Sequence, residues 1–117
     1  MPIRTAYSTR IDYMQILDEN GVLDEKLAKN ADGSPVLTDE EVLELYKYML
    51  KCRAVDDIAF KLQRAKRMGT YPQNKGQEAA AIGSGYAAQR GVDWLVPCYR
   101  ENAALWMHGL PMHYVFL

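Results

Sequence analysis

The chain has 117 residues, which is enough for one domain and too few for two. Apolar residues make up 49% and charged residues 25%, as in an ordinary soluble globular protein, and the formal net charge is −1. This balance argues against nucleic acid or an anionic membrane as a partner, and no apolar run reaches the length of a membrane span.

The two cysteines, Cys52 and Cys98, have no metal-ligand spacing and do not make a disulfide framework, so we expect two reduced thiols. The first ten residues carry Arg4 and Arg10 and no acid, but no hydrophobic segment follows them. We therefore expect a disordered amino-terminal arm rather than a targeting peptide. These features favour a bacterial or archaeal cytoplasm.

Residues 13–36 are expected to form turns and loops. Asn20 and Gly21 both tolerate positive φ, which predicts a small hairpin or an extended arm with a tight turn. A short helical turn and a loop rich in Asn, Asp, Gly, Ser and Pro are predicted over 24–35. We divide the chain accordingly into an arm and turn, 1–36, and an incomplete domain, 37–117.

A long helix is predicted to follow Leu37. Thr38 and Glu41 have the spacing of a capping box, and Gly69 is the expected stop. An apolar stripe at helical spacing supports it: Val42, Leu45, Met49, Cys52, Val55, Ile58, Leu62 and Ala65. About 30 residues of helix would span about 45 Å, which favours a helix that crosses a larger body or a partner subunit. The basic residues near its end are expected to be a solvated last turn.

A second helix is predicted from about Asn74 or Gly76 to Arg90, with Asn74 and Gln77 as a capping box. Most of its residues are small, which indicates close approach to a neighbour. That neighbour is either a cofactor above the helix or a sheet or helix packed against it, and both interpretations stay open. Gly91 is expected to end the helix.

The remaining elements are short. Trp94-Leu95-Val96 predicts a strand closed by Pro97, and a third helix is predicted over 101–108 with Gly109 as its stop. Pro111 is expected to open a fourth helix that continues to residue 117. Because the chain ends inside this apolar pattern, we expect the natural chain to continue. The fold class predicted for this portion is mostly α, with an extended arm and one or two short strands.

Few side chains carry an obvious chemical signal. No nucleotide-binding glycine loop, metalloprotease motif or CxxC occurs. His108 suits a helix C-terminus, and neither it nor His113 can be paired with a nucleophile. Asp56 and Asp57 are adjacent, so we expect two solvated charges rather than a catalytic pair. No catalytic residue and no metal ligand is therefore assigned within the chain.

Tyr99 and Arg100 directly follow the predicted strand. An Arg fork and a Tyr hydroxyl at the carboxyl end of a strand form a candidate anion site. The alternative is a salt bridge from Arg100 to Glu101 or Asp93.

The order of motifs raises the odds of an anion site. Six segments follow one another along the chain: Gly69-Thr70-Tyr71, the GQEA element at 76–79, the small-residue helix, the 94–97 strand, Tyr99-Arg100 and the WMHGLP segment at 106–111. From about Tyr13 onward the chain resembles the α subunit of the thiamine-diphosphate-dependent 2-oxo acid dehydrogenases, the pyruvate and branched-chain decarboxylating components.

The resemblance implies a parent with a thiamine-diphosphate-binding α/β fold, in a heterotetramer of two α and two β subunits. It implies that Tyr99 and Arg100 bind the cofactor diphosphate and that Thr70 and Tyr71 lie near the substrate. The cofactors would be thiamine diphosphate and Mg²⁺, the substrate a small 2-oxo acid, and the acyl acceptor a lipoyl group on the acyltransferase component.

The family's GDG…N motif, which holds Mg²⁺ and diphosphate, would lie beyond residue 117. We therefore expect residues 1–117 alone to be an inactive amino-terminal portion, and tight binding of thiamine diphosphate by the isolated chain would contradict this. The family carries other residues where this chain has Thr70 and Pro72, which leaves the choice of 2-oxo acid open. A second hypothesis is a small helical interaction module that binds a protein partner without catalysis.

Overall fold

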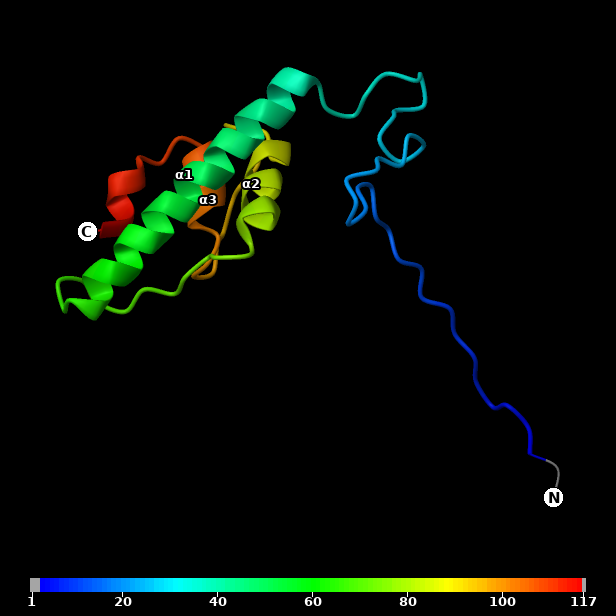
Figure 1. Ribbon diagram of the computed structural model, residues 1–117, viewed down its shortest axis with the longest axis horizontal. Helices are drawn as coiled ribbons and strands as arrows, with labels where there is room; N and C mark the ends of the chain where they lie inside the picture. Colours follow the sequence, from blue (N-terminus) through cyan, green and yellow to red (C-terminus); the bar gives the residue numbers. More distant parts are fainter. Residues whose placement is uncertain (1–2, 117) are drawn as a thin grey trace. The chain divides into compact units, whose positions relative to one another are not determined.

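The computed structural model describes residues 3–116, the side chain of residue 115 excepted (Figure 1). The chain forms two compact units, Met1–Thr38 and Asp39–Leu117. The described part is mostly helical, as predicted, and its elements are α1 (Asp39–Arg64), α2 (Glu78–Ala87), α3 (Asn102–Met107) and the 3₁₀ helix η1 (Met112–Phe116).

The first unit is built from turns. Residues 3–15 form no regular element and are exposed; residues 1 and 2 of the predicted arm lie outside the described part. The predicted Asn20-Gly21 turn is confirmed: Gly21 has φ +80°, and an antiparallel bridge joins Leu17 to Leu23. Asp18 closes this turn, because its Oδ1 accepts from the backbone N–H of Val22 at 2.7 Å.

In the second unit, α2 packs against both α1 and α3 (Figure 1). The 26 residues of α1 correspond to a length of about 39 Å. Its buried face consists of Leu45, Cys52, Asp56 and Ala59. The predicted stripe is only partly right, since Val42 and Ile58 are 49% and 52% exposed. Among the described residues, α2 and the loop at Tyr71 and Asn74 pack against α1. Apolar residues of α1 outside these contacts stay exposed.

The end of α1 differs from the prediction. The helix ends at Arg64, and Lys66 takes the left-handed conformation with φ +57°. The backbone N–H of Arg67 donates to the carbonyl of Leu62 at 2.9 Å, and that of Lys66 to Gln63 at 3.0 Å. This pair of bonds is a Schellman motif with Lys66 at C′, so Gly69 is not the helix stop.

The start of α2 also differs. The helix begins at Glu78, with Gln77 as an N-cap whose side chain makes no capping bond, and among the described residues the Asn74 side chain makes no capping bond either. The capping box predicted for Asn74 and Gln77 is therefore wrong.

The small residues of α2 serve helix packing at one position. A Cβ on Gly85 would lie 2.7 Å from the Cα of Ala104 in α3. The backbones of α2 and α3 thus approach closely, which supports the interpretation of packing on a neighbouring helix.

The predicted strand at Trp94-Leu95-Val96 is wrong: residues 39–116 contain no strand. Trp94 and Val96 are 93% and 90% exposed, and no backbone ladder reaches them among the described residues. A strand needs a partner for its backbone groups, and apolar composition alone does not supply one.

The predicted third helix is present as α3. Arg90 Nε donates to the carbonyl of His108 at 2.7 Å, and His108 Nε2 lies 3.2 Å from the carbonyl oxygen of Ala88. His108 thus joins the ends of α3 and α2. The fourth predicted helix is the 3₁₀ helix η1, and residue 117, which the prediction included, lies outside the described residues.

Candidate functional site

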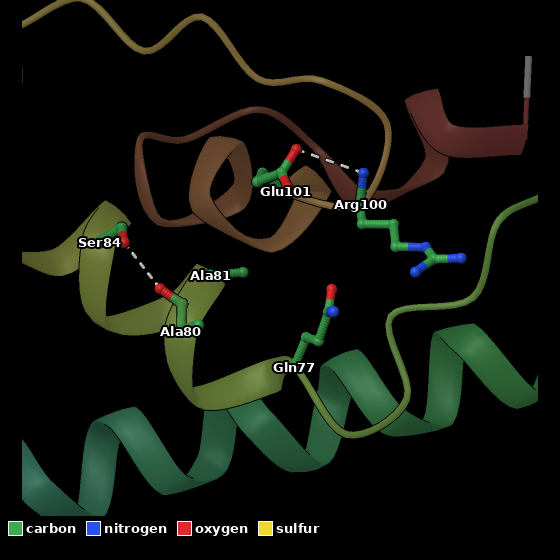
Figure 2. A pocket seen from close by; sticks show the side chains of 6 residues that line it. All are labelled: Gln77, Ala80, Ala81, Ser84, Arg100 and Glu101. Carbon is green, nitrogen blue, oxygen red and sulfur yellow. Dashed lines mark hydrogen bonds between the residues drawn. The ribbon is translucent and has the colours of Figure 1, made fainter. Parts of the chain in front are cut away.

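A pocket of about 250 Å³ opens between the N-terminal part of α2 and the loop before α3 (Figure 2). Its lining residues are Gln77, Ala80, Ala81, Ser84, Arg100 and Glu101. Because two of the α2 residues are alanines, that wall presents methyl groups and leaves space for a ligand. The lining therefore combines small side chains of α2 with Gln77, the cation Arg100 and the carboxylate of Glu101.

Arg100 has a guanidinium group without an acidic partner. None of the ion pairs within residues 3–116 includes it. The guanidinium makes a cation–π contact with Tyr99, with its Cζ 5.4 Å from the ring centroid. The salt bridge that sequence reasoning offered as the alternative is not formed. Asp93 accepts instead from the backbone N–H of Gln89 at 2.7 Å.

Glu101 fixes the loop that carries Tyr99 and Arg100. Its Oε2 accepts from the backbone N–H of Cys98 at 2.9 Å and from that of Arg100 at 3.3 Å. The carboxylate thus faces the main chain and forms no ion pair with the guanidinium of Arg100. In Figure 2 the Arg100 side chain extends away from Ala80 and Ser84, so the guanidinium lies at the edge of the pocket. A fork of unpaired donors at a pocket is suited to a phosphate group.

Tyr99 is 60% exposed and is not one of the residues that line the Arg100 pocket. Tyr71 is different: it is 6% exposed, and its hydroxyl donates to Asp56 at 3.0 Å. Burial, and then the hydrogen bond to Asp56, raise the pKa of Tyr71. Thr70 is exposed, and neither Thr70 nor Tyr71 lines the Arg100 pocket. Their role beside a substrate stays a prediction.

Asp56 lies on the buried face of α1 and anchors the loop between α1 and α2. It is fully buried, and the same Oδ1 that accepts from Tyr71 accepts from the backbone N–H of Asn74 at 2.8 Å. The expectation that Asp56 is a solvated charge is therefore wrong. Adjacency in sequence excluded a pair with Asp57, but it did not show which of the two faces inward.

A second contact ties the same loop to α1. Glu78 forms an ion pair with Arg53 through one oxygen and accepts from the backbone N–H of Gly76 at 2.9 Å through the other. The hydrogen bond from Arg53 lowers the pKa of Glu78. The loop leading into α2 is thus held at Tyr71, Asn74 and Gly76.

Sequence reasoning missed several residues of this region. Asp56 lies four residues after Cys52 and three before Ala59, so helical spacing alone places it on the buried face. The sequence placed Gln77 in a capping box and in the GQEA element, and Glu101 in a salt bridge, but it placed neither in a pocket, because that depends on how α2 meets the loop before α3.

The described residues contain no cluster of the side chains that commonly hold a metal ion: within residues 3–116, no three His, Cys, Asp or Glu side chains gather where they could do so. In the same part of the chain, no helix is long and apolar enough to cross a membrane.

Comparisons with known proteins agree with the motif order. Residues 46–117 match the family model for the dehydrogenase E1 component. The chain is 38% identical over 109 residues to the pyruvate dehydrogenase E1 component subunit alpha of Staphylococcus aureus (strain Mu50) and 37% identical to that of Staphylococcus epidermidis.

Each of these alignments covers 93% of this chain and 28% of the relative, so the chain spans about a quarter of the length of the curated relatives it matches. No solved structure gives a significant match. Because the family model covers more than half of the sequence, the chain belongs to the dehydrogenase E1 component family.

Proposed function

We propose that this chain is the amino-terminal part of the α subunit of a pyruvate-type 2-oxo acid dehydrogenase. The whole enzyme would decarboxylate a 2-oxo acid on thiamine diphosphate and transfer the acyl group to a lipoyl carrier. The relatives named above, pyruvate dehydrogenase E1 α subunits, support this assignment. The observation that carries it is the unpaired guanidinium of Arg100 at a pocket of small residues.

In this proposal the chain supplies binding and orientation. Arg100 pairs with diphosphate oxygens through its planar fork, and the hydroxyl of Tyr99 donates one more hydrogen bond. Thr70 and Tyr71 belong to the loop on the substrate side. When bound, thiamine diphosphate supplies the carbanion and the electron sink that decarboxylation requires.

The same proposal covers location and partners. Residues 37–117 belong to the thiamine-diphosphate-binding domain and residues 1–36 form an arm. Mg²⁺ takes its ligands outside the described residues, a β subunit completes each site in a two-α two-β heterotetramer, and the assembly works in the cytoplasm with a lipoyl acyltransferase.

A second candidate is an interaction module without catalysis. The observation in its favour is an apolar strip on α1, where Leu43, Tyr46 and Leu50 are 51%, 55% and 52% exposed. A helical face of this kind fits a protein partner. Cofactor affinity separates the two candidates, because the module needs no phosphate site.

The test is Arg100→Ala in the complete α subunit assembled with its β subunit. We expect thiamine diphosphate binding, measured by titration calorimetry, to weaken about tenfold to a hundredfold, because a charge-assisted hydrogen bond contributes about 1.5–3 kcal/mol. Assembly, measured by size-exclusion chromatography, should be unchanged.

The matched control is Arg67→Ala, which removes an exposed guanidinium after α1 and keeps the backbone bond that closes the helix. Its cofactor affinity should equal that of the unmodified assembly. Equal affinity in the Arg100→Ala assembly would contradict the proposed function and favour the interaction module.

A further inference from the structure

The wall of the pocket opposite Arg100 carries a second polar group that sequence reasoning did not assign. Gln77 comes directly before α2, and its carboxamide extends across the pocket toward the segment that carries Arg100 (Figure 2). No hydrogen bond joins Gln77 to Arg100 within the described residues, and the carboxamide has no other partner there. An amide group can donate two hydrogen bonds, so it is available to an anion that Arg100 binds.

The other polar side chains of the lining are already occupied. The hydroxyl of Ser84 donates its hydrogen to the carbonyl of Ala80 at 2.7 Å. The carboxylate of Glu101 has no hydrogen to give, and its Oε2 is held by the backbone N–H groups of Cys98 and Arg100 at 2.9 and 3.3 Å. Gln77 is therefore the side chain in the lining that can add a donor to that of Arg100.

The backbone around Gln77 is fixed before any ligand arrives. Its own N–H donates to the carbonyl of Asn74 at 2.8 Å, and the preceding Gly76 donates to Glu78 at 2.9 Å. Asn74 is in turn held by the buried carboxylate of Asp56 at 2.8 Å. This anchoring to α1 keeps the base of the Gln77 side chain at the pocket, which lowers the entropy lost when it binds.

We propose that Gln77 is a second diphosphate-binding residue and donates from its side-chain amide to a phosphate oxygen held by Arg100. The inference rests on the proposed function, because it assigns Gln77 to that same site. The recognised group is the diphosphate rather than the thiazolium or aminopyrimidine ring.

The test compares Gln77→Ala with Gln77→Glu in the complete α/β assembly. We expect Gln77→Ala to weaken thiamine diphosphate binding about tenfold, since it removes a hydrogen bond to a charged group. Gln77→Glu should weaken binding more than Gln77→Ala, because the new carboxylate repels the phosphate and pairs with Arg100. Inorganic diphosphate, used as a competitor, should lose affinity in the same order, whereas thiamine without phosphate should bind each variant equally.

Gln89→Glu is the control, because it adds the same charge after the far end of α2, outside the pocket lining. It should bind thiamine diphosphate like the unmodified assembly. If Arg100→Ala weakens binding but both Gln77 variants bind normally, the role of Gln77 is wrong and the proposed function stands. If Gln77→Glu weakens binding no more than Gln77→Ala, contact with the phosphate is contradicted. If Arg100→Ala also has no effect, the proposed function fails as well.

Discussion

Asp56 shows how one buried side chain can organise a loop. It accepts hydrogen bonds from Tyr71 and Asn74 at 3.0 and 2.8 Å, while its neighbour Asp57 forms an ion pair with Lys75 at 3.3 Å in which both side chains are about half exposed. The two adjacent acids therefore differ in what their removal should cost. Buried donors that lose their acceptor lower the free energy of unfolding substantially, whereas an exposed ion pair contributes little to it.

We predict that Asp56→Ala lowers the free energy of unfolding by about 2–4 kcal/mol, because two buried donors lose their acceptor. Asp56→Asn keeps one acceptor oxygen and should lose less. Asp57→Ala should change stability by about 0.5 kcal/mol or less. Urea unfolding followed by circular dichroism measures all three. An Asp56→Ala variant as stable as Asp57→Ala would refute the anchoring role.

Cys52 makes the stability of the folded chain depend on pH, and the direction of the pKa shift of its thiol gives the sign. Burial, and then the charges of Glu78 and Asp56, raise the pKa of its thiol from 9.0 to about 11. Between these values the unfolded chain has released the proton and the folded chain retains it. The contribution to stability is thus fully present below pH 9 and is lost as the pH rises toward 11.

We therefore expect the urea concentration at the midpoint of unfolding to decrease as the pH is raised from 9 to 11. Cys52→Ala should be less stable at pH 8, and its midpoint should decrease less over the same pH range. Cys98→Ala is the control, because Cys98 is exposed, and its slope should equal that of the unmodified chain. The same slope in the Cys52→Ala chain would show that other groups cause the pH dependence.

At the scale of elements, two glycines of α2 have opposite surroundings. A Cβ on Gly85 would lie 2.7 and 2.8 Å from the Cα and the carbonyl oxygen of Ala104, whereas a Cβ on Gly83 would meet nothing within 4 Å. Backbone atoms of α3 cannot move aside as a flexible side chain can. Close packing of α2 on α3 thus requires glycine at one of these positions only.

We predict that Gly85→Ala lowers the free energy of unfolding by about 1–3 kcal/mol through overpacking. Gly83→Ala should raise it by about 0.5–1 kcal/mol, because alanine favours the helix and no atom stands in its way. Thermal unfolding of the two variants gives the signs. Stabilisation by both substitutions would contradict the close approach of α2 and α3.

The ends of the helices show where local rules suffice. Acidic residues occupy the first turn of α1, and the helix starts at Asp39, one residue after the predicted cap Thr38. Its end was predicted at Gly69 because glycine takes positive φ most easily, yet Lys66 takes that conformation at φ +57°. The two backbone bonds of the Schellman motif stabilise the reversal there.

At the scale of the whole molecule, helix packing buries a small part of the apolar surface. Trp94 and Val96 are among the most exposed residues, and α1 keeps Leu43, Tyr46 and Leu50 about half exposed. The predicted length of α1 was about right, whereas the predicted burial of its apolar stripe was only partly right. Helical periodicity extends along the whole element, whereas burial depends on what packs against each face.

The sequence by itself determined the helices, the Asn20-Gly21 turn and the family, because caps, periodicity, turn residues and motif order are local properties of the chain. It also determined that Tyr99 and Arg100 stand together after a short apolar segment. The order of GQEA and the Tyr-Arg pair was sufficient to indicate the family that the comparisons show.

Only the tertiary structure decided which groups meet. It showed that Arg100 has no acidic partner within residues 3–116 and that Gln77, directly before α2, lines the same pocket. It also showed that Asp56 is buried and that residues 94–96 pair with no strand in that range. Burial, pairing and strand formation require a second segment of chain at a given place, and no local pattern contains that information.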